Sequence, residues 1–293
     1  MRLGIIGLGE VGRCYAAALS VQKGVNVSLC DPAPGPLATA LAVRLGSRIE
    51  TAPGPWLAGC QWVFSCVVGS AALKVAGECM PFLRAQDTGY ADFTTADPEQ
   101  IRQAARLAAH ANVVFLDIAI LGAIAATGAQ TPLLVAGKVA PSWQDLMRAT
   151  GARVALLPDA SPGDATALKL LRSAFTKSLE AVTVEVLAAA ERRGLRRAFY
   201  EIVSDIGGGT LPPYFETLIL THVVHAARRH LEVQEVRRQF DAIGLVSDVL
   251  PGIEASFART RAALADASTP VPSRDMAEAL RWLLATRSIE NVA

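Results

Sequence analysis

The chain has 293 residues and a formal net charge of +1, from 28 basic and 27 acidic side chains. Because so small a charge creates no strong electrostatic field, we expect neither nucleic acid nor an anionic membrane surface as a partner. The hydrophobic content of 52% with only 19% charged residues indicates a large core or a subunit interface, and the length favours two domains over one.

Neither a membrane span nor a metal site is expected. No run approaches the roughly eighteen uninterrupted apolar residues of a span, and the apolar N-terminus breaks too early for a signal peptide. The five cysteines all lie in the first third of the chain, without a Cys-x-x-Cys spacing and away from the four histidines. This pattern predicts reduced thiols in a cytoplasmic protein without a metal.

A glycine motif separates a predicted strand over residues 3–6 from a helical pattern over residues 13–20. In its Gly-x-Gly-x-x-Gly spacing, Gly7 permits a tight turn, Gly9 lets the backbone approach a pyrophosphate, and Gly12 lets the helix pack close to the strand. The N–H groups at the helix start would then face the anion. A glycine-rich turn without a ligand is the alternative. We expect the segment to bind a dinucleotide through Gly7, Leu8, Gly9, Glu10, Val11 and Gly12.

An acidic residue follows the second predicted strand. This strand spans residues 25–30 and leads into Asp31, which lies about twenty residues beyond the last glycine, where dinucleotide-binding folds place an acid that binds the adenosine ribose hydroxyls. The carboxylate would repel a 2′-phosphate. We therefore predict NAD as the cofactor, with NADP as a second candidate because Arg44 could swing near.

Short apolar runs alternate with helical stretches through the first half of the chain. This alternation predicts a doubly wound parallel sheet with helices on both faces, the Rossmann arrangement. After a helix over residues 37–45, further strands are expected over residues 62–68, 88–93, 113–118, 132–137 and 154–157. Val67 and Val68 end the first of these strands, so we expect them against the dinucleotide, although ordinary strand packing would also explain them.

Pro158, Pro162 and Gly163 mark a domain boundary. We predict an NAD(P)-binding Rossmann domain over residues 1–160 and an all-helical domain for substrate binding and dimerisation over residues 161–293. The expected helices span residues 164–191, 196–204, 213–240, 249–264 and 274–286. Since the first of these helices is apolar on most sides, a second copy of the chain is expected to cover it in a homodimer.

Lysine is scarce in the second half of the chain. After residue 158 there are fourteen arginines but only two lysines, Lys169 and Lys177. A partly desolvated lysine amine can lose its proton, which suits general acid–base catalysis, whereas arginine stays protonated. Lys169, Ser173 and Lys177 share one helix face, so Ser173 and Lys177 are expected to bind the substrate beside Lys169. A solvated surface charge is an equally good interpretation of Lys177.

This layout resembles the beta-hydroxyacid dehydrogenases, the family that contains 3-hydroxyisobutyrate and 6-phosphogluconate dehydrogenases, over nearly the whole chain. Residues 7–12 resemble the family's Gly-Leu-Gly-x-Met-Gly, residues 92–98 its Asp-x-Ser-Thr-x-x-Pro, residues 117–123 its Asp-Ala-Pro-Val-Ser-Gly-Gly, and residues 163–169 its Gly-x-Gly-x-x-x-Lys. The resemblance implies that Lys169 is the catalytic acid–base, with its amine close to Thr95 and Gly122. Thr95 would lie beside the nicotinamide, and Gly122 would belong to the substrate-binding segment.

Three departures indicate a divergent branch of this family with a distinct helical C-terminal domain. Leu121 replaces the family's substrate-binding serine, Ala123 replaces the following glycine, and Ser173 replaces an asparagine. His225 and Arg229 fit this branch and share one helix face, from which they could reach an anionic substrate across a dimer interface. An interface or surface pair explains them at least as well.

These observations predict a cytoplasmic NAD(P)-dependent dehydrogenase or reductase that transfers hydride between the nicotinamide and a small, anionic, hydroxy-carboxylate-like alcohol or carbonyl substrate. Lys169 would take up the hydroxyl proton in oxidation or return it in reduction. Two alternatives stay open. The replacement at Leu121 favours a nucleotide-responsive binding protein without turnover. Imine reduction is the other alternative, but related imine reductases replace the lysine that this chain retains.

Overall fold

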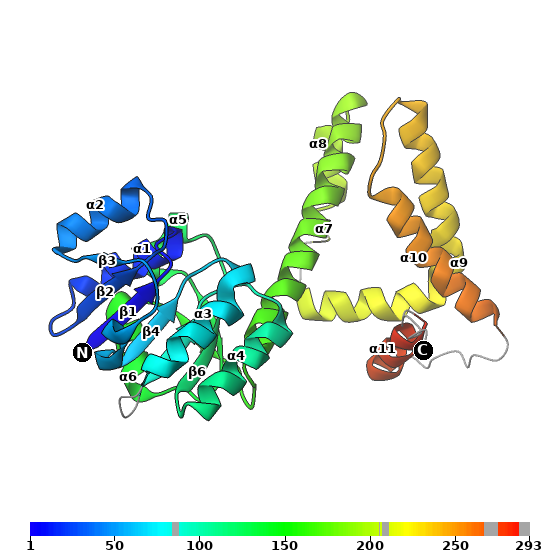
Figure 1. Ribbon diagram of the computed structural model, residues 1–293. Coiled ribbons are helices and arrows are strands. Elements are labelled where there is room, and N and C mark those ends of the chain that lie inside the picture. The colour runs from blue at the N-terminus through cyan, green and yellow to red at the C-terminus, as the bar shows by residue number, and fades with distance from the viewer. Residues whose placement is uncertain (84–87, 205, 207–210, 267–274, 287–293) are drawn as a thin grey trace. The chain divides into compact units, whose positions relative to one another are not determined.

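The computed structural model describes residues 1–83, 88–204, 206, 211–266 and 275–286 and forms two compact units, Met1–Phe175 and Thr176–Ala293 (Figure 1). The boundary between the units lies inside helix α7 (Asp164–Arg192), whereas the sequence-based division falls just before this helix. The first turns of α7, which carry Lys169, therefore belong to the unit that contains the sheet.

The first unit contains an eight-stranded sheet in the order β3-β2-β1-β4-β5-β6-β7-β8. Its strands are β1 (Arg2–Ile6), β2 (Asn26–Cys30), β3 (Ile49–Glu50), β4 (Trp62–Ser65), β5 (Gly89–Asp92), β6 (Val114–Ile120), β7 (Leu133–Ala136) and β8 (Val154–Leu156). Strands β1 to β6 run parallel, and the strand order reverses at β1, which lies between β2 and β4. This is the predicted Rossmann arrangement, and it places a crevice at the carboxyl ends of β1 and β4.

The sheet departs from the all-parallel expectation at its last two strands. β7 pairs antiparallel with β6, and β8 runs parallel to β7. Only the short helix α5 (Ile124–Thr127) and a 3-10 turn over Gly128–Gln130 lie between β6 and β7, whereas a parallel pair needs a longer crossover, usually with a full helix. The chain therefore turns back beside β6.

Helices cover both faces of the sheet because successive strand residues point to opposite faces. One face carries α1 (Glu10–Ser20), α2 (Pro36–Leu45) and α6 (Pro141–Thr150), and the other carries α3 (Ala72–Cys79) and α4 (Pro98–His110). Leu3 and Ile5 of β1 join the first cluster of buried apolar side chains, while Ile6 joins the second. The two clusters thus form a hydrophobic core on each face of the sheet.

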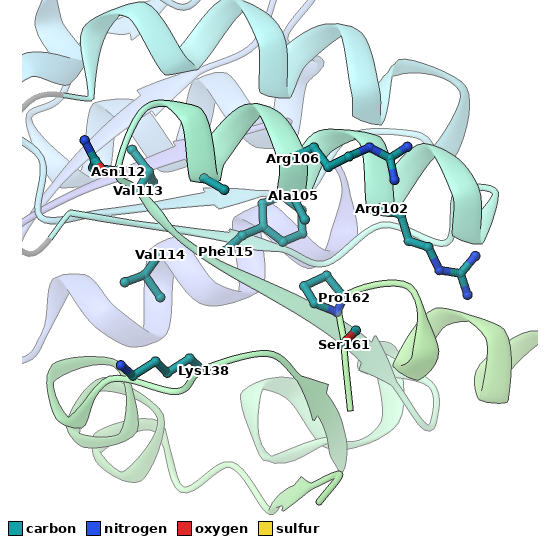
Figure 2. Close-up of a pocket in the computed structure, with 11 residues that line it drawn as sticks. Arg102, Ala105, Arg106, Asn112, Val113, Val114, Phe115, Lys138, Ser161 and Pro162 are labelled. Atoms are coloured by element: carbon teal, nitrogen blue, oxygen red, sulfur yellow. The ribbon is translucent and has the colours of Figure 1, made fainter. Parts of the chain in front are cut away.

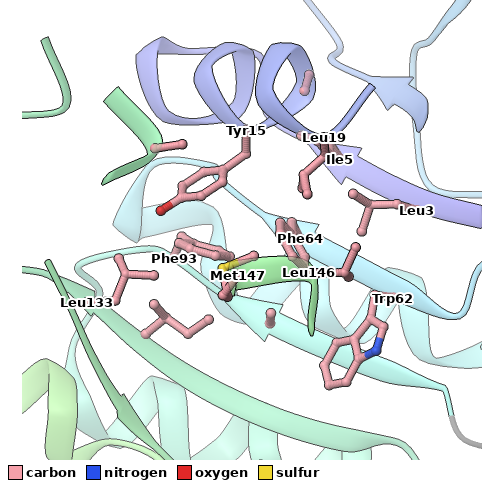
Figure 3. Packing of buried hydrophobic residues seen from close by; sticks show 14 of the residues in the cluster. Leu3, Ile5, Tyr15, Leu19, Trp62, Phe64, Phe93, Leu133, Leu146 and Met147 are labelled. Atoms are coloured by element: carbon pink, nitrogen blue, oxygen red, sulfur yellow. The ribbon is translucent and has the colours of Figure 1, made fainter. Parts of the chain in front are cut away.

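Three aromatic rings in the first cluster tie α1 to the sheet (Figure 3). The ring centroid of Phe93 lies 4.9 Å from that of Tyr15 and 5.0 Å from that of Phe64. Such pairs add about 0.5–1.5 kcal/mol each beyond the burial of their area. Since Phe93 immediately precedes Thr94 and Thr95, this packing holds the segment after β5 in a fixed place relative to α1.

All the regular elements that the structure describes in the second unit are helices. Besides the later turns of α7, it contains α8 (Arg196–Ile202), α9 (Leu211–Ala242), α10 (Leu250–Ala265) and α11 (Met276–Ala285). These helices agree closely with the predicted ones, although the expected start at Arg274 lies outside the described residues. Glu185 of α7 accepts hydrogen bonds from the N–H groups of Asp248 and Val249 at 2.8 and 3.0 Å, which satisfies donors at the start of α10.

Among the residues that the structure describes, no helix is both long enough and apolar enough to cross a membrane.

Candidate active site

The glycine motif lies in the turn between β1 and α1, and its glycines have three different environments. Gly7 has a φ of +85°, and a Cβ there would lie 2.7 Å from the carbonyl oxygen of Cys66. A Cβ on Gly12 would collide with the carbonyl oxygen of Gly7, whereas a Cβ on Gly9 would meet nothing within 4 Å. Gly7 therefore forms the tight turn, Gly12 allows the close packing, and Gly9 leaves the open space that a dinucleotide loop requires.

A cavity of about 590 Å³ lies at the carboxyl ends of β1, β2 and β4. Of the predicted cofactor-binding residues, those that line it are Gly7, Gly9, Asp31, Val67 and Val68. Leu8 is buried in the core below the loop, and Glu10, Val11, Gly12 and Thr95 are not among the lining residues. The cavity therefore collects side chains from both sides of the strand-order reversal, where the fold binds its ligands.

Asp31 is held against the glycine loop. One oxygen of its carboxylate accepts a hydrogen bond from the Leu8 N–H group at 2.7 Å, and the other accepts one from the Ala33 N–H group at 2.9 Å. Acceptors of this kind are oriented before any ligand arrives, and each still has lone pairs that could accept from a ribose hydroxyl.

Sequence reasoning missed part of the cavity wall. Thr51 and Pro53 after β3, together with Lys74 and Glu78 of α3, also line the cavity. The Lys74 amine lies 3.8 Å from the Glu78 carboxylate, and both side chains are exposed, so their mutual attraction is weak. These four residues belong to no motif, and only the folding of separate segments around the crevice brings them together.

Lys169 contacts Thr95, whose backbone packs against the residue that follows the cavity lining. A Cβ on Gly69, which directly follows the lining residue Val68, would lie 2.6 Å from the Thr95 carbonyl oxygen. The Thr95 hydroxyl in turn accepts a hydrogen bond from the Lys169 amine at 2.6 Å. Thr95 therefore connects the cavity wall to the lysine that the family resemblance identifies as the acid–base.

Burial governs the protonation of Lys169. The side chain is half-buried, and this burial lowers the pKa of its amine below the ordinary value, while the negative charge of Asp117 opposes the shift. A lowered pKa makes the neutral amine more accessible near neutral pH, which a proton-accepting lysine needs.

Two buried carboxylates bind the segments that carry Lys169 and Thr95. Asp117 of β6 accepts hydrogen bonds from the N–H groups of Gly163 and Thr166 at 2.8 and 3.1 Å and from the Thr166 hydroxyl at 2.6 Å. Asp92 of β5 accepts one from the Thr94 N–H group at 2.8 Å. Burial raises the pKa of both carboxyl groups, that of Asp92 to about 6. The sequence contains both aspartates in family-like motifs but does not reveal what they bind.

The predicted substrate-binding residues are divided between the two units. Gly122 follows β6, and Ser173 lies one turn after Lys169 on α7, where its side chain is half-buried. Lys177 is exposed and belongs to the second unit, as do His225 and Arg229 of α9. The Arg229 guanidinium donates a hydrogen bond to the Thr221 hydroxyl at 3.1 Å. The roles of these residues stay predictions.

The described residues contain no group of three or more histidine, cysteine or acidic side chains that could hold a metal ion, and all five cysteines are free thiols.

A second cavity, of about 640 Å³, lies between α4, the start of β6 and the loop before α7 (Figure 2). Arg102, Phe115, Lys138 and Pro162 are among its lining residues, and none of the predicted site residues is. The Arg102 guanidinium lies 3.5 Å from the carboxylates of both Glu99 and Asp164. The Arg102 charge therefore already has partners within the protein.

Comparison with known proteins identifies relatives of both units. Residues 2–157 match the NAD-binding domain of 6-phosphogluconate dehydrogenase. An uncharacterised 28.5 kDa protein of Methanothermus fervidus is 25% identical over 238 residues, which are 81% of this chain and 90% of that protein. A solved conserved protein of unknown function, described as structurally similar to 3-hydroxyacid dehydrogenases, is 27% identical with a TM-score of 0.61, over 89% of this chain and 97% of its own.

The imine reductase of Streptomyces aurantiacus has a TM-score of 0.75 at 19% identity, over 96% of this chain and 99% of its own. At this identity the likeness establishes the fold alone.

Proposed function

The chain belongs to the 6-phosphogluconate dehydrogenase family through its NAD-binding domain, and from this premise we propose that it oxidises or reduces a small, anionic hydroxy-carboxylate or its carbonyl counterpart. Its first unit is an NAD(P)-binding oxidoreductase scaffold. The observation that supports the proposal is the hydrogen bond between Lys169 and Thr95, which joins an amine of lowered pKa to a segment that packs against Gly69, the neighbour of the lining residue Val68.

The residues of the first unit fit a dinucleotide. The open space around Gly9 leaves room for a pyrophosphate against the backbone, at the end of the turn from which α1 begins. Asp31 lines the same cavity with a carboxylate that the glycine loop orients. A bound nicotinamide supplies the hydride chemistry, and the protein supplies the binding, orientation and proton transfer.

Lys169 is the proposed proton carrier. Its Nζ atom accepts the proton of the substrate hydroxyl in oxidation, and in reduction it returns this proton to the carbonyl oxygen. The Thr95 hydroxyl fixes the amine, since their hydrogen bond restricts an otherwise flexible side chain. The protonated amine also favours an anionic substrate, and Ser173, one turn further along α7, is the proposed neighbouring contact.

Two alternative functions follow from particular residues. Leu121 stands where the family carries a substrate-binding serine, which favours a nucleotide-responsive binding protein without turnover. Imine reduction is the other alternative, but a likeness of fold alone stands behind it, and Lys169 argues against it, because a retained lysine suits proton exchange with a hydroxyl or carbonyl oxygen.

A second copy of this chain is the proposed partner. Along α7, Leu171 and Leu179 are 66% and 55% exposed in the single chain, and other large apolar side chains of this helix are also exposed. Apolar patches on this scale are uncommon on monomeric proteins and mark interaction surfaces. We propose a homodimer that buries this face of α7.

The function is tested with a panel of hydroxy acids, keto acids and cyclic imines, in which the absorbance of the reduced nicotinamide is followed with both cofactors. Turnover of a hydroxy acid or keto acid supports the proposal. Turnover of imines alone would establish the imine reductase alternative, and cofactor binding without turnover across the panel would favour the binding protein.

A further inference from the structure

We propose that Asp117 is a positioning residue for Lys169: it fixes the first turn of α7 to the middle of β6 and thereby sets the place of the Lys169 amine against Thr95. This inference rests on the proposed function for its catalytic meaning. The positional claim concerns only the first unit and is testable without a substrate.

The geometry at the start of α7 is the first argument. The Asp117 carboxylate accepts three hydrogen bonds, from the Gly163 N–H, the Thr166 N–H and the Thr166 hydroxyl. Asp117 is 1% exposed and Thr166 is fully buried. The first N–H groups of a helix lack partners within the helix, so a carboxylate from the sheet satisfies them here. Thr166 and Lys169 lie three residues apart, on neighbouring positions of one helix face.

The neighbouring strand anchors the other partner of the contact. Asp92 and Asp117 are register partners on β5 and β6, and Asp92 is 1% exposed. Asp92 binds the Thr94 N–H group, and Thr94 directly precedes Thr95. One buried carboxylate thus holds the segment that supplies the acceptor, and the adjacent one holds the helix that supplies the amine.

Other charges near the start of α7 are on the exposed side of the helix. Arg102 of α4 lies 3.5 Å from Asp164 and also pairs with Glu99, and these side chains are 40% or more exposed. Exposed pairs of this kind contribute little to a fixed geometry. Asp117 is the buried charge at this place, and its field also raises the pKa of Lys169 against the effect of burial.

The experiment compares Asp117→Asn with two substitutions of its partner, Thr166→Val and Thr166→Ser. Two rates are measured by NMR without a substrate: amide hydrogen exchange at residues 163 and 166, and solvent exchange of the Lys169 ammonium protons at mildly acidic pH. The Lys169 signal is assigned by its loss in Lys169→Arg. Asp275→Asn is the control, because it removes a carboxylate that caps α11 in the second unit by accepting from the Glu278 N–H group.

We expect both exchange rates to rise roughly tenfold in Asp117→Asn, as for the loss of hydrogen bonds to a charged group, and less in Thr166→Val. Thr166→Ser keeps the hydroxyl and is expected to match the wild type, as is the control. Faster amide exchange with an unchanged Lys169 ammonium would mean a purely structural role and would overturn the proposal.

If Asp117→Asn does not fold, the comparison of Thr166→Val with Thr166→Ser tests the proposal instead. Equal exchange rates of the Lys169 ammonium protons in these two variants would overturn the proposal. Failure of the proposed function is distinguishable, because the exchange rates require no turnover. With an active substrate, Asp117→Asn should lower kcat with little change in KM.

Discussion

Asp92 and Asp117 face each other across neighbouring parallel strands at the same register, and both carboxylates are almost completely buried. Asp92 accepts a hydrogen bond from the Thr94 N–H group in the segment that follows its strand. Asp117 accepts hydrogen bonds from the N–H groups of Gly163 and Thr166 at the start of α7. Lys169 and Thr95 meet directly beyond these anchors. The arrangement leads to a set of predictions about catalysis, cofactor binding, stability and assembly.

Lys169→Ala should lower turnover by roughly a hundredfold to ten-thousandfold, the usual contribution of positioned acid–base catalysis. Cofactor affinity should change little, because the glycine loop is untouched. Lys169→Arg should not restore activity, since a guanidinium stays protonated at working pH. The measurement is kcat for both variants at matched cofactor saturation, and an active arginine variant would remove Lys169 from the mechanism.

Gly9→Ala should leave the fold intact and weaken cofactor binding. A Cβ at this position meets no protein atom within 4 Å, but it would occupy the space through which a pyrophosphate approaches the backbone. We expect the dissociation constant to rise by about tenfold or more, which corresponds to about 1.4 kcal/mol. Gly35→Ala is the matched control, because its Cβ also meets nothing within 4 Å and lies outside the cavity lining. Equal affinities in the two variants would contradict the predicted site.

NAD(H) should bind more tightly than NADP(H), because the Asp31 carboxylate lines the cavity and would repel a 2′-phosphate. Replacing Asp31 by Asn should reduce the ratio of the NADP(H) to the NAD(H) dissociation constant by roughly tenfold, since it removes the negative charge of the side chain and keeps most of the side-chain shape. Dissociation constants for both cofactors, measured by calorimetry with each protein, provide the check. Tighter binding of NADP(H) to the wild type would refute the assignment.

Stability should decline as the pH rises through the titration of Asp92. The pKa of this carboxyl is raised to about 6 in the folded protein from 3.8, and burial is the largest cause. The folded state therefore binds more protons than the unfolded state between these values, so the free energy of unfolding falls with rising pH across this window, by on the order of 3 kcal/mol.

Asp92→Asn should remove most of this pH dependence, since an amide keeps the acceptor for the Thr94 N–H group and does not titrate. Urea unfolding at several pH values across the window measures the effect, with the exposed Asp145→Asn as the control. If the free energy of unfolding depends on pH identically in the wild type and in Asp92→Asn, a group other than Asp92 causes the dependence.

The protein should be at least a dimer at micromolar concentration, because Leu171 and Leu179 on α7 are largely exposed in the single chain. Leu171→Glu should shift the population toward monomer, since a charge would be buried in an apolar interface. Val43→Glu is the control, because Val43 is 77% exposed but lies on α2 and not on α7. Sedimentation or light scattering gives the mass, and a monomeric wild type would rule out the proposed interface.

Local patterns in the sequence were sufficient for the elements and for the glycine loop. The alternation of short apolar runs with helical periods predicts seven of the eight strands and the helices of the second unit to within a few residues. It misses the two-residue strand β3, and the strand expected over residues 62–68 ends at Ser65, so that Val67 and Val68 follow β4 instead of ending it. The spacing of Gly7, Gly9 and Gly12 predicts the turn that the structure contains. These features depend on backbone conformation and side-chain period, which neighbouring residues set among themselves. The family resemblance added the expectation that Lys169 lies close to Thr95, and the structure contains this contact.

The tertiary structure alone decided how distant segments meet. In it, β7 and β8 run antiparallel to the other strands, because the short connection after β6 turns the chain back beside that strand. It also brought Lys74 to the cofactor crevice and joined Asp117 to the start of α7, although 46 residues separate Asp117 from Gly163. Contacts over such separations depend on strand order and on which buried polar groups find partners, and no local periodicity in the sequence encodes either.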